Sequence, residues 1–336
     1  MWHPFKYLLP IVLLLGTIGC ENSKPGSDSN QRISVIFDTD ANNEIDDQHA
    51  LAYLLLNENT FDVRGVTVNA TFNGGNIEGH FEEAKRVIQL CDQAGEMPLY
   101  KGANGSFSEI KDEIDTTEFD GFEAVNFIIK TAAQIKDTLT LIAVGKLTNV
   151  ALALEKEPSI TSKIRLVWLG SNYPEPGEYN MENDTAAMNY LLNSPIHFEL
   201  VTVRYGKASG TDAVRVTQKE ANDHMPGKGP RIDNPVTGRH GGSFHTFGDY
   251  SVNLFNHIDY YGDPPARALF DMAAVAILKN SKWAEYKEIP APILVNGYWN
   301  DRAANEHSIG IWENFKKKEI LDDFYSTFET HTPGKG

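Results

Sequence analysis

Acidic side chains gather at one turn near the start of the chain, between an apolar run at 33–37 and an apolar stretch at 50–56. They are Asp38, Asp40, Glu44, Asp46 and Asp47. Carboxylates this close repel one another, and a bound Ca²⁺ or Mg²⁺ would offset the repulsion because such ions prefer oxygen ligands. The alternative is an acid-capped surface turn, in which Asp46 and Asp47 suit the N-terminus of a helix. The metal hypothesis is favoured because the acids follow the carboxyl end of a predicted strand, where open α/β sheets place their sites.

The same stretch resembles the opening of the nucleoside hydrolase family, in which a strand ends in Asp-Thr-Asp and a short turn leads to Asp-Asp. Here these pieces are residues 38–40 and 46–47. The turn between them, 41–45, is longer than the family's usual Pro-Gly-containing turn. The difference suggests an outlying branch rather than a core purine or pyrimidine hydrolase.

Two later segments are similar to the family in the same order. Residues 145–149, Gly-Lys-Leu-Thr-Asn, match a segment whose Thr gives its backbone carbonyl to calcium, a role that would fall to Thr148. Thr148 or its neighbour Asn149 also suits a helix cap, and the two roles are compatible. Residues 177–180, Gly-Glu-Tyr-Asn, resemble a motif whose Glu and Asn hold sugar hydroxyls, here Glu178 and Asn180.

Further sugar ligands are less sharply specified. The loop 171–176 is shorter than in typical members, and it offers Asn172 as a sugar ligand. The family also has one ribose-binding Asn after the second strand. Asn73 is the best match by position, while Asn69 and Asn76 compete with it. A Gly/Asn-rich turn without a ligand would have the same composition.

The last matching segment is 270–276, which resembles His-Asp-Pro-x-Ala-Val-Ala. Asp271 would complete the metal site, although a lone Asp before an apolar helix is also a common N-cap. Phe270 replaces a His that helps to protonate the leaving base in some members. His245 lies in the loosely patterned region 242–247, and it is either a substitute for that His or an ordinary loop residue.

The resemblance implies a Ca²⁺-dependent N-glycosidase that cleaves a ribonucleoside or related ribosyl compound. Ca²⁺ would be held by Asp40, Asp47, Asp271 and the Thr148 carbonyl. Asp40 would act as general base, and the sugar would be held by Asp46, Asn73, Asn172, Glu178 and Asn180. The alternatives are a hydrolase of another glycoside on the same fold, or a lipoprotein that binds a sugar or nucleoside without cleaving it. The presence of Asp40 argues against binding alone.

The elements that must position these residues alternate along the chain. Strands are predicted at 33–37, 61–68, 98–101, 138–144, 164–169 and 197–203, and helices at 50–56, 78–90, 122–135, 149–157 and 185–192. This order predicts an α/β fold with a mainly parallel, twisted, Rossmann-like open sheet flanked by helices. Beyond 204 we expect a long loop at 227–248, a helix at 267–278 and late strands at 290–296 and 308–312, where antiparallel pairing is one option. The tail after Phe324 is expected to be loosely ordered.

The first 19 residues have the pattern of a signal peptide, with Lys6 before a short apolar run. The Cys at position 20 resembles a bacterial lipobox cysteine, and 21–30 is a polar tether. We therefore expect a lipid anchor on Cys20, with the protein periplasmic or at the cell surface and residues 31–336 forming one domain. Ordinary signal cleavage is the alternative.

Composition limits the partners. The chain has 336 residues and a formal net charge of −16, which argues against nucleic acid and anionic membrane surfaces as partners. The expected partner is a small nucleoside or ribosyl substrate, and a homo-oligomer is compatible with the sequence. With Cys20 lipidated, Cys91 would be the only thiol, so the domain would depend on packing rather than on an intrachain disulfide.

Overall fold

The computed structural model describes residues 1–2 and 32–334, and its helices and strands lie between Ile33 and Thr330. The predicted signal peptide, the anchor at Cys20 and the tether fall almost entirely on residues outside the described part. Within that part, no helix is both long enough and apolar enough to cross a membrane.

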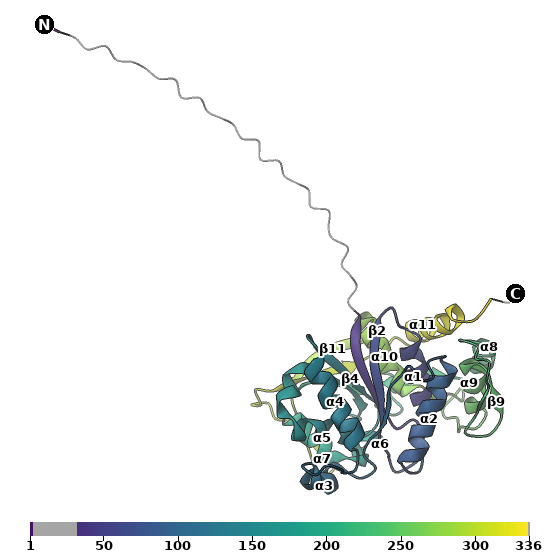
Figure 1. Ribbon diagram of the computed structural model, residues 1–336, viewed down its shortest axis with the longest axis horizontal. Coiled ribbons are helices and arrows are strands. Elements are labelled where there is room, and N and C mark those ends of the chain that lie inside the picture. Colours follow the sequence, from purple (N-terminus) through teal and green to yellow (C-terminus); the bar gives the residue numbers. More distant parts are fainter. Residues whose placement is uncertain (3–31, 335–336) are drawn as a thin grey trace. The chain divides into compact units, whose positions relative to one another are not determined.

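One eight-stranded sheet organises the domain, in the order β11-β14-β6-β5-β4-β1-β2-β3. Figure 1 labels its strands β2, β4 and β11. Neighbouring strands are parallel except β11, which is antiparallel to β14. The central strands are buried on both faces, as parallel strands covered by helices must be. Their bounds are β1 Ile33–Thr39, β2 Phe61–Val68, β3 Leu99–Lys101, β4 Leu139–Ala143, β5 Ile164–Gly170, β6 His197–Thr202, β11 Glu285–Pro290 and β14 Ser308–Glu313.

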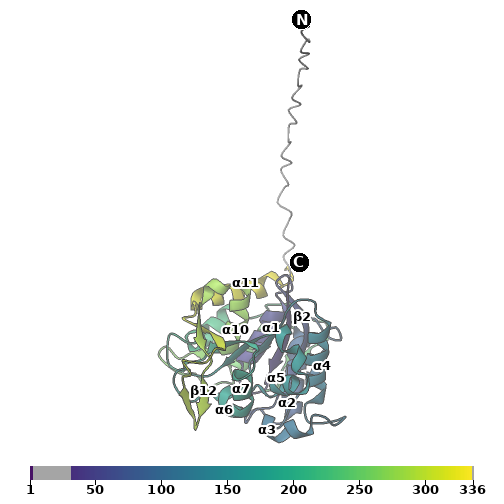
Figure 2. The same ribbon diagram turned by 90° about the vertical axis from the view of Figure 1, so that its left-hand side faces the viewer.

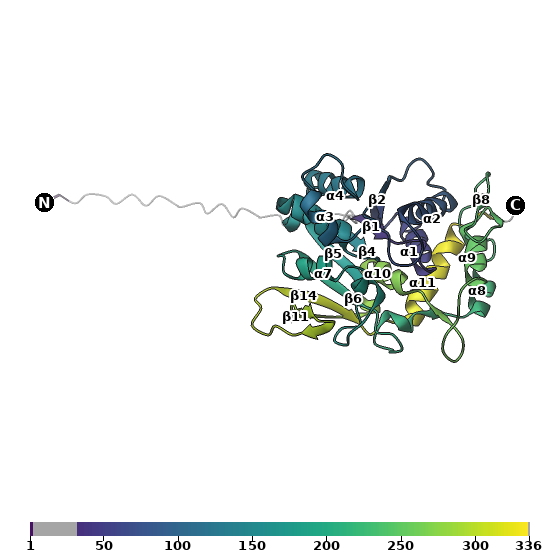
Figure 3. The same ribbon diagram turned by 90° about the horizontal axis from the view of Figure 1, so that it is seen from below.

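Helices cover both faces of this sheet, as Figure 3 shows. Successive side chains of β1 alternate between two cores, with Val35 and Phe37 in one and Ile36 in the other. The first core is shared with α1 Asp46–Leu55, α2 Ile77–Leu90, α8 Gln218–His224, α9 Phe247–Phe255, α10 Phe270–Lys279 and α11 Lys317–Thr330. The second is shared with α3 Phe107–Ile110, α4 Phe122–Gln134, α5 Thr148–Lys156 and α7 Thr185–Leu192. The predicted fold class is therefore confirmed.

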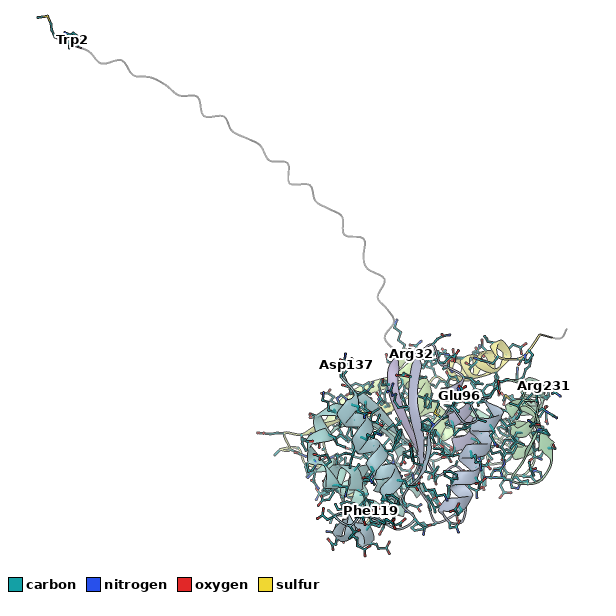
Figure 4. All side chains as sticks on the ribbon, viewed as in Figure 1. Trp2, Arg32, Glu96, Phe119, Asp137 and Arg231 are labelled. Atoms are coloured by element: carbon teal, nitrogen blue, oxygen red, sulfur yellow. The ribbon has the colours of Figure 1, made fainter. Side chains whose placement is uncertain are left out.

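The carboxyl ends of the strands lie at one end of the domain. Figure 4 labels Arg32, just before β1, at the opposite end from Phe119. Figure 2 shows α11 at the same end as the start of β1. It shows α3 and α6, Tyr179–Asn183, at the end where the parallel strands finish. Most residues predicted to form the site follow β1, β4 and β5, and they therefore lie at the carboxyl ends of these strands.

The region beyond 204 is more structured than the sequence suggested. The expected loop 227–248 contains a small hairpin, β8 Val236–Thr237 with β9 Ser243–Phe244, and the start of α9. The expected helix at 267–278 begins three residues late. Its first residues form β10, Arg267–Ala268, which pairs with β7, Arg215–Val216.

The late strands also differ from expectation. The stretch 290–296 is split between the end of β11 and β12 Ile293–Val295, which pairs with β13 Tyr298–Asn300. Short 3₁₀ turns complete the chain at Lys111–Glu113, Pro158–Lys163, Thr211–Ala213 and Ser281–Trp283.

The prediction of a loose tail after Phe324 is wrong. Helix α11 continues to Thr330, and both Phe324 and Phe328 are fully or almost fully buried. The ring of Phe328 stacks on Phe247 of α9 at 5.3 Å between centroids. Apolar residues four positions apart share one helix face, and that face completes the core beside α1 and α9.

Candidate functional site

Seven carboxyl groups line one cavity of about 360 Å³; Glu44 and Asp212 are paired with arginines, and the other five come from three parts of the chain. Asp40 follows β1, Asp46 and Asp47 open α1, Glu178 immediately precedes α6, and Asp271 lies in the first turn of α10. Each of these residues is at most 7% exposed. The α1 and α10 helices pack against each other, so their N-terminal turns present acids to the same space. The structure thus brings together residues that are more than 200 positions apart in the chain.

Hydroxyl groups fix two of these acids. The Thr71 hydroxyl donates to Oδ2 of Asp40 at 2.5 Å, and the Thr39 hydroxyl donates to Oδ1 of Asp47 at 2.5 Å. Glu178 accepts hydrogen bonds from the backbone N–H groups of Ser171, Asn180 and Met181. The orientation of these three carboxylates is therefore set by the surrounding protein.

Asp38, the first acid of the turn, has a structural position instead. It is fully buried and is absent from the cavity lining. Its carboxylate accepts hydrogen bonds from Thr67 at 2.6 Å, Asn149 at 2.7 Å and Asn69 at 3.1 Å. Asp38 therefore ties β1 to the end of β2 and to the first turn of α5.

Burial raises the pKa of each of these five acids. The pKa of Asp46 and that of Glu178 rise to about 7, mainly because burial disfavours the charged form, and neighbouring Asp40 adds repulsion to both. For Asp47 and Asp271 burial again dominates, and repulsion from the other acids raises the pKa of each well above the usual range. The pKa of Asp40 is raised as well. The arrangement therefore favours a bound positive charge.

The donor set fits a hard cation. Carboxylate oxygens of Asp46, Asp47 and Asp271 lie within 4.8 Å of one another. Within 32–334, no Lys or Arg forms an ion pair with these three acids, so a cation would meet uncompensated oxygens. Oxygen-only ligands suit Ca²⁺ or Mg²⁺. Two of the three predicted aspartates, Asp47 and Asp271, are in this cluster, and Asp40 lies beside it.

The predicted carbonyl ligand Thr148 is buried at the start of α5, and it is not among the residues lining the cavity. Its hydroxyl donates to Asp184 at 2.5 Å rather than capping α5. The side chain of Asp184 in turn caps α7 through the N–H of Ala187.

Asn180 and Glu178, which the sequence predicted as sugar ligands, both line the cavity. The amide nitrogen of Asn180 donates to the carbonyls of Val144, after β4, and Leu169, in β5. The two donations fix the side chain, and both carbonyl-bearing residues also line the cavity.

Three predicted substrate ligands are not brought into the cavity. Asn73 is exposed on the loop after β2, and its backbone N–H donates to the hydroxyl of Tyr179 at 2.8 Å. The Asn172 side chain bonds Gly177 and the backbone of Tyr205, so it shapes a loop. His245 contacts the carbonyl of Ile232 at 2.8 Å, within the segment beside α9.

Asn69, one of the two competing asparagines, lies closer to the acids. It is fully buried, and its Oδ1 has no hydrogen-bond partner within the described part of the protein. A Cβ added to Gly145 would lie 2.8 Å from this oxygen and 2.9 Å from Oδ1 of Asp40. Gly145 thus leaves room beside two acceptor oxygens. Asn69 directly follows the end of β2, and this position could have marked it in the sequence as a residue of the site.

The remaining wall of the cavity contains Arg267, Arg215 and Tyr261, which the sequence analysis had not marked. Arg267 pairs with Glu44, and its guanidinium lies over the ring of Tyr261 at 5.5 Å. Arg215 pairs with Asp212, and Phe270 meets Tyr205 edge to face. All of these come from the inserted turn 41–45 or from the region beyond 204, where the sequence pattern is weakest.

Known proteins share this sequence pattern. A family model described as inosine-uridine preferring nucleoside hydrolase matches residues 35–319. An uncharacterised protein of Schizosaccharomyces pombe is 27% identical over 217 residues, which cover 56% of this chain and 67% of that protein. A probable uridine nucleosidase of Oryza sativa subsp. japonica is 28% identical over 189 residues, covering 48% of this chain and 53% of that protein. The chain thus matches only about half the length of the second relative.

Solved structures share the fold over nearly the whole domain. A plant nucleoside hydrolase has a TM-score of 0.68 at 16% identity, covering 90% of this chain and all of that one. An inosine-uridine preferring nucleoside hydrolase from Bacillus anthracis has a TM-score of 0.65 at 17% identity, covering 89% of this chain and 99% of that one. At these identities the likeness concerns the fold.

Proposed function

The chain belongs to the inosine-uridine preferring nucleoside hydrolase family, and from this premise we propose that it hydrolyses the N-glycosidic bond of a ribonucleoside with Ca²⁺ as cofactor. One observation carries the proposal: five buried carboxyl groups that have no Arg or Lys partner in the described structure line a single cavity at the carboxyl ends of the strands. Burying so many acids costs stability, and such a cost is commonly tolerated at functional sites.

Asp40 is the proposed general base. Its Oδ2 is occupied by the Thr71 hydroxyl, while its Oδ1 lies beside the space at Gly145 and is the atom available to a water molecule. Burial raises its pKa, which increases its affinity for a proton. As the water oxygen bonds to C1′ of the sugar, its proton passes to Asp40, and the C1′–N electron pair leaves with the base.

The sugar is proposed to bind through Asp46, Glu178 and Asn180. Carboxylates accept hydrogen bonds from ribose hydroxyls, and these bonds strengthen as the ring flattens towards an oxocarbenium ion. The residues are held by helix N-termini and backbone N–H groups, so they need little reorganisation. Binding that tightens in the transition state is what raises the rate.

The proposed Ca²⁺ ligands are Asp40, Asp47, Asp271 and the Thr148 carbonyl, with Asp46 close enough to share in the site. When bound, the cation supplies positive charge that lowers the pKa of a neighbouring water and offsets repulsion among the acids.

Incubation with uridine, inosine, cytidine and adenosine tests the function. Free ribose is measured by a reducing-sugar assay, before and after removal of divalent ions. We expect release of ribose that is lost with chelator and recovered with Ca²⁺. Tight nucleoside binding without ribose release would instead support the alternative of a binding protein, and release unaffected by chelator would remove Ca²⁺ from the proposal.

We also propose that the protein is held at a membrane by a lipid on Cys20. The support is the signal-like segment before it and the polar residues 21–30 after it.

A further inference from the structure

The leaving base poses a charge problem that the acids of the cavity do not solve. When the C1′–N bond breaks, its electron pair stays on the base, which becomes negative unless something protonates it or stabilises the charge. Position 270, where the family resemblance led us to look for a His, holds Phe270. Within the described part of the chain, no His lines this cavity. Any group that eases departure of the base must therefore be of another kind.

Two arginines are the basic side chains among the described lining residues. Arg215 is already well bonded. Its Nε donates to the carbonyl of Asp212 at 2.9 Å, its Nη1 donates to the carbonyl of Tyr261 at 3.2 Å, and its Nη2 pairs with the Asp212 carboxylate. Little donor capacity is left on Arg215 for a ligand.

Arg267, in contrast, has most of its hydrogen-bond donors unused in the part of the chain that the structure describes. Its side chain is 8% exposed, yet its one ion-pair partner in the described structure is Glu44, and its buried Nε has no hydrogen-bond partner there. A guanidinium carries five N–H donors, and burying it without partners for them is costly. The face of Tyr261 supports the cation without using its donors. The group is held in place and retains donors for a ligand.

The local structure also gives Arg267 the right neighbours. It lies in β10, whose pairing with β7 fixes its backbone, four residues before the proposed metal ligand Asp271. Its partner Glu44 comes from the long turn 41–45, so the feature that departs from the family pattern holds the guanidinium. If a sugar binds to the unpaired acids of the cavity, its base must lie against the remaining wall. That wall includes Arg267, Tyr261 and Phe270.

We propose that Arg267 is a catalytic residue that stabilises the departing base by donating hydrogen bonds to it, in the role that a histidine has in some family members. The inference rests on the proposed function. An arginine does not give up its proton, so the base departs as an anion held by the guanidinium and takes its proton from water afterwards. The C1′–N bond breaks, the C1′–O bond forms, and the proton of the attacking water goes to Asp40.

The test compares two substrates that differ in how much help their leaving group needs. Uridine has a poor leaving group, whereas p-nitrophenyl riboside releases a stable phenolate that needs no assistance. Replacing Arg267 by Met should lower kcat/KM for uridine on the order of 10²–10³-fold, as loss of a charge-stabilising donor does elsewhere, and for p-nitrophenyl riboside by less than about tenfold. Arg267→Gln should show the same selectivity, and Arg267→Lys should recover part of the uridine activity.

Arg215→Met is the matched control, because it removes a cation from the same wall but one whose donors are already used. It should affect both substrates to a similar extent. Equal losses for the two substrates in both Arg267→Met and Arg267→Gln would overturn the inference, and Arg267→Gln decides alone if the Met variant does not fold. A wild-type protein that cleaves neither substrate would instead contradict the proposed function.

Discussion

Removing divalent ions should make the stability of the domain depend on pH in an unusual direction. Asp46 has an ordinary pKa of 3.8, and burial raises it to about 7 in the folded protein. An acid whose folded pKa is raised stabilises the fold only when protonated, so its contribution is lost as pH rises through about 7. Between pH 5 and pH 8 this one group should lower the free energy of unfolding by about 3 kcal/mol. Repulsion among its buried neighbours acts in the same direction.

The measurement is thermal unfolding of chelator-treated protein at the two pH values, with and without added Ca²⁺. A loss of about 3 kcal/mol corresponds to a melting temperature lower by roughly 5–10 °C at pH 8 for a domain of this size. Ca²⁺ should raise the melting temperature more at pH 8 than at pH 5, because the ligands are then already deprotonated.

Two variants check this assignment: Asp46→Asn is the test, and Asp223→Asn is its control. The first removes the buried titrating group and should reduce the pH dependence of the metal-free protein. The second changes a surface acid paired with Lys219, and it should leave that dependence unchanged because exposed pairs contribute little. Metal-free protein that is as stable at pH 8 as at pH 5 would refute the reasoning.

Three further outcomes are expected. Asp40→Asn should lower kcat on the order of 10²–10⁴-fold; near-normal turnover in a variant that retains its metal by elemental analysis would exclude Asp40 as the base. Phe328→Ala should destabilise the domain by about 3–5 kcal/mol in denaturant unfolding, because its fully buried ring packs on α9; a loss below about 1 kcal/mol would show that the end of α11 is dispensable. Cys20→Ser should abolish labelling by a palmitate analogue in cells, and labelling equal to wild type would contradict the lipid anchor.

The sequence predicted the central part of the fold well because strong local signals agree there. The strand at 61–68 and the helix at 185–192 have the predicted bounds, since apolar periodicity and clear turn residues mark their ends. The prediction for the tail after Phe324 failed because that segment is stabilised by tertiary contacts. The residues around Phe324 and Phe328 gain stability from α1 and α9, which are distant in the chain.

In the candidate site, too, residues within short motifs were predicted and those outside them were not. Acids within short motifs, such as Asp46 and Glu178, were found because motif order fixed them. Asn69 was passed over in favour of Asn73 because several asparagines follow β2, and only the fold shows which of them is buried beside Asp40. Arg267 had no motif, and its significance comes from an ion pair with a residue more than 200 positions earlier.

The position of β14 has a consequence for how the domain is assembled. Its residues 308–313 fit between β6, which ends at Thr202, and β11. Until about 310 residues have been made, the outer edge of β6 has no strand beside it, and an open strand edge invites pairing with other chains. Pairing across such a long stretch of chain is also slow. During synthesis the half-built sheet should therefore depend on chaperones, and truncation before β14 should yield aggregates rather than a smaller active enzyme.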